Sequence, residues 1–183
     1  MTYYGGKELA AAFRTVRGNT IKIAEEIPEA KYDFSPASGT RSVAQTLVHI
    51  GLGPTFALHI HGNKIADMKT VNFQELMQKN GAEEAKPRTK AEIVAFLTSE
   101  GEKFASFLEG MSDSFLAEPV AMMPGTAPAT KSRFELLLGA KEHEMHHRAQ
   151  LMQVQRMIGL VPHLTRQMQE WMAQRQQAQA ARA

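Results

Sequence analysis

The chain has 183 residues, enough for one domain with a substantial hydrophobic core. Its net charge is +2, which gives no electrostatic basis for nucleic-acid binding, and the absence of cysteine excludes disulfides and thiolate ligands. Residues 1–6 do not read as a signal peptide, and the longest apolar run, residues 47–60, is too short to cross a bilayer. We therefore expect a cytoplasmic protein that binds neither nucleic acid nor membranes.

The first half of the chain predicts two long helices. Apolar residues spaced alternately four and three apart predict one helix that stops at Pro28. After a connection over residues 32–40, Ser42 and Gln45 form a capping box that opens a second helix. Pro54 should kink this helix, which we expect to end near Gly62.

The middle of the chain is less regular. Asn72 can cap a short helix over residues 73–79, closed by the pair at 80–81, and residues 83–87 should be an exposed polar connection. Thr89 and Glu92 form a second capping box, which opens a long helix with a stop near Gly110.

The second half predicts a loop, one long helix and a tail. Residues 112–130 contain three prolines and should form a long loop. Ser132 and Glu135 form a third capping box, and the helix that it opens should run to about Ile158. The tail, residues 166–183, holds six glutamines and the only tryptophan, and could be an exposed helix, a dimer contact or a frayed end.

No alternating pattern requires a sheet, so the sequence predicts an all-α protein with four main helices and long connecting loops. We place the bundle in residues 1–165 and treat residues 166–183 as a separate helical or disordered tail.

The candidate site is a set of histidines. His143 and His147 are four residues apart, which places both imidazoles on one helix face. By helical spacing they share a stripe with core residues, whereas His146 falls in a polar row and should flank the site. That stripe also contains Leu136, Ala140, Val154 and Ile158.

His49 lies in the middle of the second helix and is the best candidate for a third ligand. Three imidazoles can bind one divalent ion, such as zinc, nickel or iron, and leave a coordination position for water or substrate. The ion would act as a Lewis acid. The plainer alternative is three core histidines satisfied by carbonyl groups or water, without a metal.

Other readings of the same residues are weaker. Residues 143–147 also match HExxH, with Glu144 as the general base of a protease, but His163 is the only histidine downstream and no strand is evident to align a peptide. We expect His163 to be solvated in a turn, and His59 and His61 to lie at the surface near a helix end.

Two segments resemble the DinB/YfiT-like family. Residues 42–50, with a capping serine, an apolar stretch and His49, resemble the start of its second helix. Residues 143–151 resemble its second motif, in which the first and fifth positions, here His143 and His147, are the other two metal ligands. Ala149 departs from the glycine common in that motif but is nearly as small. The likeness extends from the first helix to about Pro162.

The resemblance implies an up-down-down-up four-helix bundle, commonly a homodimer, with a three-histidine metal site at one end. Members of this superfamily include thiol S-transferases that use bacillithiol or mycothiol, a maleylpyruvate isomerase and metal-dependent hydrolases. Our first hypothesis is therefore a metal-dependent thiol S-transferase acting on a small molecule, with Arg148 or the 112–130 loop near the substrate. The alternatives are a hydrolase that uses metal-bound hydroxide and a non-catalytic, metal-stabilised binding module.

Overall fold

The computed structural model describes residues 4–181. The expectations for residues 1–6 and for the end of the tail therefore fall partly outside the described residues. The helices of the bundle are α1 (Gly6–Glu26), α2 (Val43–Leu52), α3 (Pro54–Gly62), α5 (Lys90–Glu109) and α7 (Arg133–Met157). The smaller or peripheral elements are α4 (Phe73–Glu84), α6 (Asp113–Ala117), α8 (His163–Ala180) and the strands β1 (Pro119–Ala121) and β2 (Thr130–Ser132).

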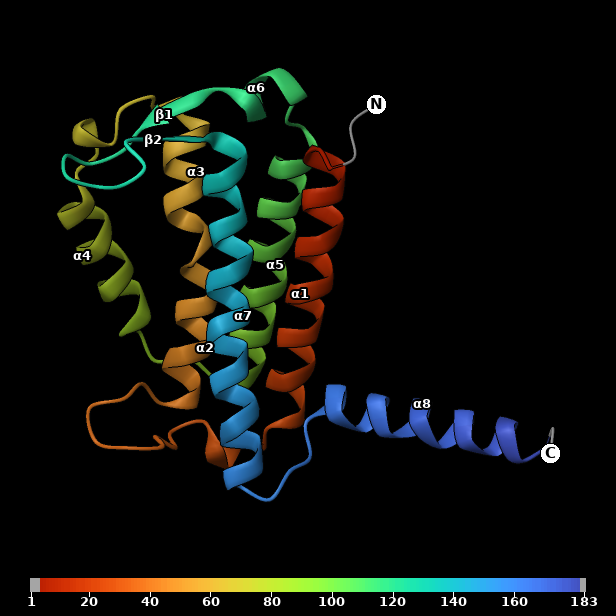
Figure 1. Cartoon of the computed structure of the whole chain (residues 1–183). Helices are drawn as coiled ribbons and strands as arrows, with labels where there is room; N and C mark the ends of the chain where they lie inside the picture. The colour runs from red at the N-terminus through yellow and green to blue at the C-terminus, as the bar shows by residue number, and fades with distance from the viewer. Residues whose placement is uncertain (1–3, 182–183) are drawn as a thin grey trace.

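The bundle has the expected up-down-down-up order. Helices α1 and α7 run in one direction, whereas α5 and the α2–α3 rod run in the other (Figure 1). Two parallel neighbours need a return connection between them, and α4 provides it by descending beside α2 on the outside of the bundle (Figure 1). The all-α, four-helix prediction is confirmed.

Local sequence signals set most helix boundaries. All three capping boxes form, with Ser42, Thr89 and Ser132 accepting hydrogen bonds from the backbone N–H groups of Gln45, Glu92 and Glu135. Pro54 is the first residue of α3 because a proline cannot donate the backbone hydrogen bond that a continuous helix needs. The predicted kink is therefore a break between α2 and α3.

Two expectations about the connections are wrong. Helix α4 does not end near residue 79 but continues through Asn80 and Gly81 to Glu84, where Arg41 pairs with the Glu84 carboxylate. The 112–130 loop contains α6 and β1, and β1 pairs antiparallel with β2. Strands of three residues are too short to show an alternating pattern, which explains why the sequence gives no sign of them.

A buried ion pair joins all four bundle helices. Arg17 of α1 donates to both carboxylate oxygens of Glu144 on α7, at 2.9 and 3.1 Å from Nε. The same guanidinium donates to the carbonyl of Leu97 on α5 and to that of Ile50 on α2. Gly101 makes room for it, because a Cβ there would lie 2.6 Å from Arg17 Cγ. Apolar clusters lie around this polar centre.

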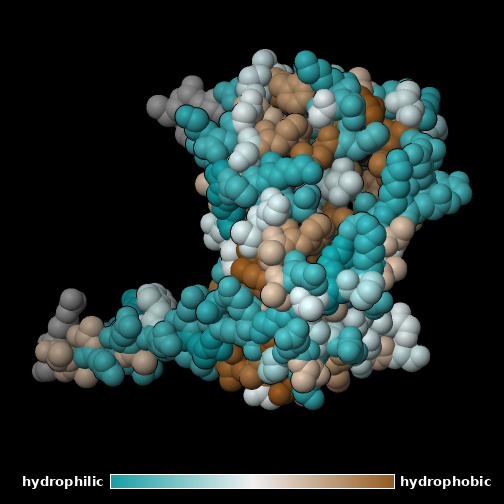
Figure 2. Space-filling view, turned by 180° about the vertical axis from the view of Figure 1, so that it is seen from behind, coloured by the Kyte–Doolittle hydropathy of each residue, from teal (hydrophilic) through white to brown (hydrophobic). Residues whose placement is uncertain are grey.

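Helix α8 leaves the bundle as a single arm (Figures 1 and 2). Its first residue, His163, is buried and bonds through Nε2 to Asn19 Oδ1 at 3.2 Å, and Arg166 pairs with Glu26 at 2.6 Å. The tail is helical from its start, and its described residues beyond Arg166 are exposed. Among the described residues, no helix is both long and apolar enough to cross a membrane.

Candidate metal centre

The structure brings the three predicted histidines together. One ligand atom from each of His49, His143 and His147 lies within 4.8 Å of the others, and the ring centroids are 4.6–4.9 Å apart. Nε2 of His49 is 3.1 Å from Nε2 of His143. Two nitrogens bound to one tetrahedral zinc ion lie roughly 3.3 Å apart. The donor set therefore fits one divalent ion with little rearrangement.

The second ring nitrogens of two of these histidines have partners. Nδ1 of His49 lies 3.1 Å from Oε2 of Glu84, and Nδ1 of His147 lies 2.8 Å from Oε1 of Gln150. These oxygens accept, so each Nδ1 carries the proton and each Nε2 is left with a free lone pair. This arrangement of imidazole, partner and open nitrogen is common at metal sites, where the partner fixes ring orientation and tautomer.

The environment keeps the rings neutral. Burial, together with the nearby rings of His147 and His49, lowers the pKa of His143 to about 4. Burial also lowers the pKa of His49 and of His147 below the ordinary histidine value. At neutral pH all three imidazoles are therefore uncharged, which is the form that binds a metal ion.

The bundle fixes the positions of these rings from two sides. Glu144 and Ile50, which hold Arg17, are the immediate neighbours of His143 and His49 in sequence, so the buried ion pair anchors both helices beside the site. Gly53 lets the His143 ring approach the α2–α3 break, because a Cβ at Gly53 would lie 2.9 Å from His143 Nδ1. The cluster lies part-way along α7 and beside the α2–α3 break, not at one end of the bundle as the resemblance implied.

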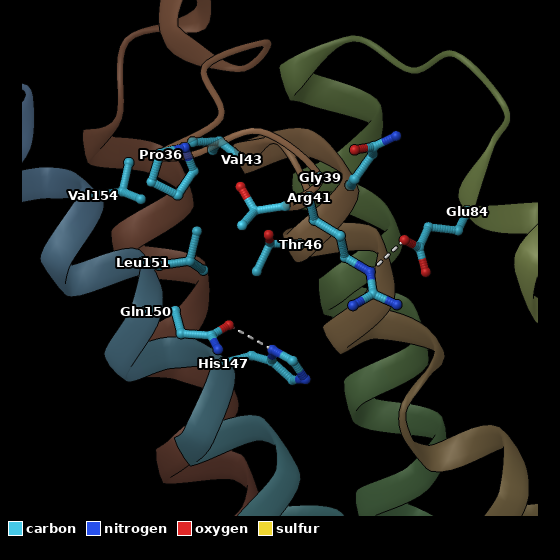
Figure 3. Close-up of a pocket in the computed structure, with 12 residues that line it drawn as sticks. Pro36, Gly39, Arg41, Val43, Thr46, Glu84, His147, Gln150, Leu151 and Val154 are labelled. Carbon is cyan, nitrogen blue, oxygen red and sulfur yellow. Dashed lines mark hydrogen bonds and ion pairs between the residues drawn. The ribbon is translucent and has the colours of Figure 1, made fainter.

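Two cavities meet at the cluster. A polar cavity of about 650 Å³ is bordered by His147 and Gln150 of α7, with Thr46 and Arg41 on the other side (Figure 3). A second cavity, of about 500 Å³, is bordered by His49 and His143 and has mainly apolar side chains around it. Arg41 and Glu84 line both cavities. The three histidines thus face two different chemical environments.

Several sequence expectations for other residues are wrong. His61 is 2 % exposed, not at the surface, because Arg133 holds its Nδ1 at 3.4 Å. His163, the first residue of α8, is buried against Asn19 of α1 instead of solvated in a turn. Glu144 is 1 % exposed and fully engaged with Arg17, so it cannot serve as the base of an HExxH protease. His146 is exposed beside the cluster, as expected.

Other residues of the site were missed or misassigned. Arg148 and the 112–130 loop, which we expected near a substrate, are not among the residues that line the two cavities. Sequence reasoning missed Glu84 and Arg41, which border the site from α4 and from the loop before α2. No local signal distinguishes Glu84 from other charged residues nearby, because its role depends on the return path of α4.

The fold and the histidine cluster define a helical-bundle protein with a candidate metal centre. The chain belongs to the DinB superfamily, whose family model matches residues 12–151. It is 25 % identical over 144 residues to the uncharacterized protein YjoA of Bacillus subtilis, a match that spans 79 % of this chain and 84 % of YjoA.

Solved structures share the fold. The crystal structure of the DinB-like YjoA superposes with a TM-score of 0.61 at 20 % identity, over 83 % of this chain and 92 % of that one. YfiT from B. subtilis, described as a probable metal-dependent hydrolase with an unusual four-helix bundle topology, gives a TM-score of 0.65 at 12 % identity. That match covers 87 % of this chain and 91 % of YfiT.

Proposed function

We propose that this protein is a divalent-metal-dependent enzyme in which Nε2 of His49, His143 and His147 hold the ion. The observation that supports it is the convergence of three neutral imidazoles, two with partnered Nδ1 atoms, where two cavities meet. When bound, the ion would supply Lewis-acid chemistry and lower the pKa of a thiol or water ligand. Zinc, nickel or iron suits an all-nitrogen donor set.

Among enzymes of this kind, the two cavities favour a transferase with two substrates. A hydrolase needs only water beside its organic substrate, whereas a thiol S-transferase must hold both a thiol and an electrophile. Thr46, Gln150 and Arg41 give the cavity beside His147 the hydrogen-bonding groups that a polar thiol such as bacillithiol or mycothiol would need (Figure 3). We therefore propose a thiol S-transferase that acts on a small molecule.

Metal-dependent hydrolysis is the second candidate. The likeness to YfiT, which is described as a probable metal-dependent hydrolase, supports this reaction class. The non-catalytic binding module is less well supported, because a purely structural metal site is usually closed and this cluster borders two cavities.

Metal analysis tests the proposal at its base. Purified protein should contain about one equivalent of a divalent metal, and His147→Ala should retain about one-tenth of that or less because it removes one of three ligands. His59→Ala is the matched control, since His59 lines neither cavity and is not one of the three clustered histidines. Equal metal content in His147→Ala and wild type would reject the site. Failure of the wild type to bind zinc, nickel or iron on reconstitution would also reject it.

Thermal unfolding gives a readout that does not depend on activity. Free metal at a hundredfold excess over Kd should raise Tm by about 5–10 °C, and a chelator should reverse the rise.

Two activity assays separate the two reactions. Turnover of an aryl halide that requires added bacillithiol supports the transferase. Hydrolysis of an ester without any thiol supports the hydrolase.

A further inference from the structure

The cavity beside His49 and His143 has the features of a site for an apolar group. Its volume of about 500 Å³ falls within the range of small-molecule sites. Side chains from α2, α3, α4, α7 and the turn before α4 form an apolar lining. These residues are Leu52, Phe56, Ile60, Met68, Met77 and Leu136.

Two helix glycines line this cavity and have free space beside them. Gly81 of α4 and Gly139 of α7 both line it, and a Cβ at either position would have no atom within 4 Å. By contrast, a Cβ at Gly51 would collide with Phe96. Glycine inside a helix costs about 0.5–1 kcal/mol relative to alanine. At Gly81 and Gly139 no close helix contact offsets that cost, and a side chain at either position would have free space beside it.

The polar groups of the cavity gather mostly on the side of the histidine cluster. Arg41 and Glu84 stand between this cavity and the polar one, and His49 and His143 present the candidate metal position. Farther from the cluster, His61 is held by Arg133, whose guanidinium also donates to the Ile65 carbonyl at 3.0 Å. A bound molecule would thus meet polar groups at one end and hydrocarbon along its length.

We propose that this cavity binds the alkyl or aryl portion of an amphipathic small-molecule substrate, whose reacting group lies at His49, His143 and His147. The assignment of the reacting group rests on the proposed function, but binding of the apolar portion does not require the metal. The polar cavity beside His147 then takes the second, polar reactant.

A homologous series of n-alkanols, from butanol to decanol, tests the apolar site by isothermal titration calorimetry. Alkanols are weak metal ligands, so the series measures the cavity in both metal-loaded and chelator-treated protein. Affinity should rise about fourfold per added methylene, equivalent to about 0.8 kcal/mol, until the cavity is full. An affinity that does not change with chain length would overturn the proposal.

Cavity-filling variants locate the binding. Gly139→Leu on α7 and Gly81→Leu on α4 add a side chain at two positions that line the cavity, and both should weaken octanol binding at least tenfold while raising helix propensity. Gly18→Leu is the matched control, because Gly18 lies in mid-helix on the exposed face of α1 with no atom within 4 Å of its Cβ position. Octanol binding by both cavity variants at the wild-type affinity would contradict the assignment.

The metal readout separates this proposal from the proposed function. The protein could take up no metal and still bind alkanols with an affinity that depends on chain length and is lost in the two cavity variants. This result would reject the metal-dependent enzyme but support the apolar site. Metal uptake without chain-length-dependent binding would support the metal site and reject the apolar one.

Discussion

Glu84 shows how one carboxylate can adjust a candidate metal ligand. Its Oε2 accepts from Nδ1 of His49 at 3.1 Å, while its other oxygen accepts from Arg41. We expect Glu84→Gln to weaken metal affinity about 10–100-fold, because outer partners of ligating histidines typically contribute that much. Competition with a chromogenic chelator measures the change. Glu75→Gln is the control: the Glu75 carboxylate lies on the same helix, pairs with Lys79 and Asn72 and lines neither cavity, so this variant should bind metal as the wild type does.

Gly53 sets the distance between His143 and the α2–α3 break. The backbone there is helical, so alanine causes no backbone strain, but its Cβ would lie 2.9 Å from Nδ1 of His143. We expect Gly53→Ala to displace the ring and reduce metal content, with little change in helicity by circular dichroism. Gly62→Ala, where the added Cβ meets nothing within 4 Å, is the control. Normal metal loading in both variants would show that the ring tolerates the contact.

At the scale of residues, the sequence identified what depends on spacing within one helix. His143 and His147 lie one helical turn apart, and His49 lies in a helix that opens with a clear capping box. All three could therefore be selected as candidate metal ligands from the sequence. Glu84 and the burial of His61 could not, because both depend on contacts across the chain. In the sequence, Glu84 is one of several charged residues in a polar segment, and His61 is a residue near a helix end.

The buried pair of Arg17 and Glu144 belongs to the scale of the helices that it joins. We expect Glu144→Ala to lower the free energy of unfolding by about 3–5 kcal/mol, because it leaves a buried guanidinium without its counter-charge. Urea unfolding measures this loss. Replacing both residues by methionine should recover much of it, since no isolated charge then remains in the core. If Glu144→Ala were as stable as the wild type, the pair would not organise the bundle.

Helix α8 carries an exposed row of large apolar side chains. Met168, Trp171 and Met172 lie along it, each more than half exposed, and the exposed part of the helix, residues 167–180, is short enough to be marginal as an isolated helix in water. The homodimer stays a prediction, and we expect α8 to be its contact. Sedimentation equilibrium should show a dimer that Trp171→Glu dissociates, whereas Gln177→Glu, on the opposite face, leaves it intact. A monomeric wild type would contradict this.

Among the elements, helices with strong end signals could be predicted and those held by distant contacts could not. The capping boxes fixed the starts of α2, α5 and α7 to the residue. Helix α4 passes through Asn80 and Gly81, a pair that usually ends a helix, because its far end packs beside α2 and contacts Arg41 and His49. Tertiary contact thus overrides a local stop signal.

For the whole molecule, stability should fall in mild acid partly through His61. Burial and the neighbouring Arg133 lower its pKa in the folded protein to about 4, compared with about 6.5 in an unfolded chain. A lowered pKa means that the unfolded state binds the proton first, so the stabilisation is complete above pH 6.5 and is lost progressively as pH falls to 4. Thermal unfolding across this range should show a shallower loss for His61→Gln than for wild type. Parallel curves would exclude this role.

Helix α4 buries none of its side chains completely, yet it forms the outer boundary of the metal centre. It supplies Glu84 to both cavities and Met77, Asn80 and Gly81 to the apolar one. An outward movement of α4 would admit a bulky reactant and would at the same time remove the carboxylate that accepts from His49. In the proposed enzyme, access to the apolar cavity and affinity for the ion would therefore change together, and the affinity would be highest while α4 lies against α2.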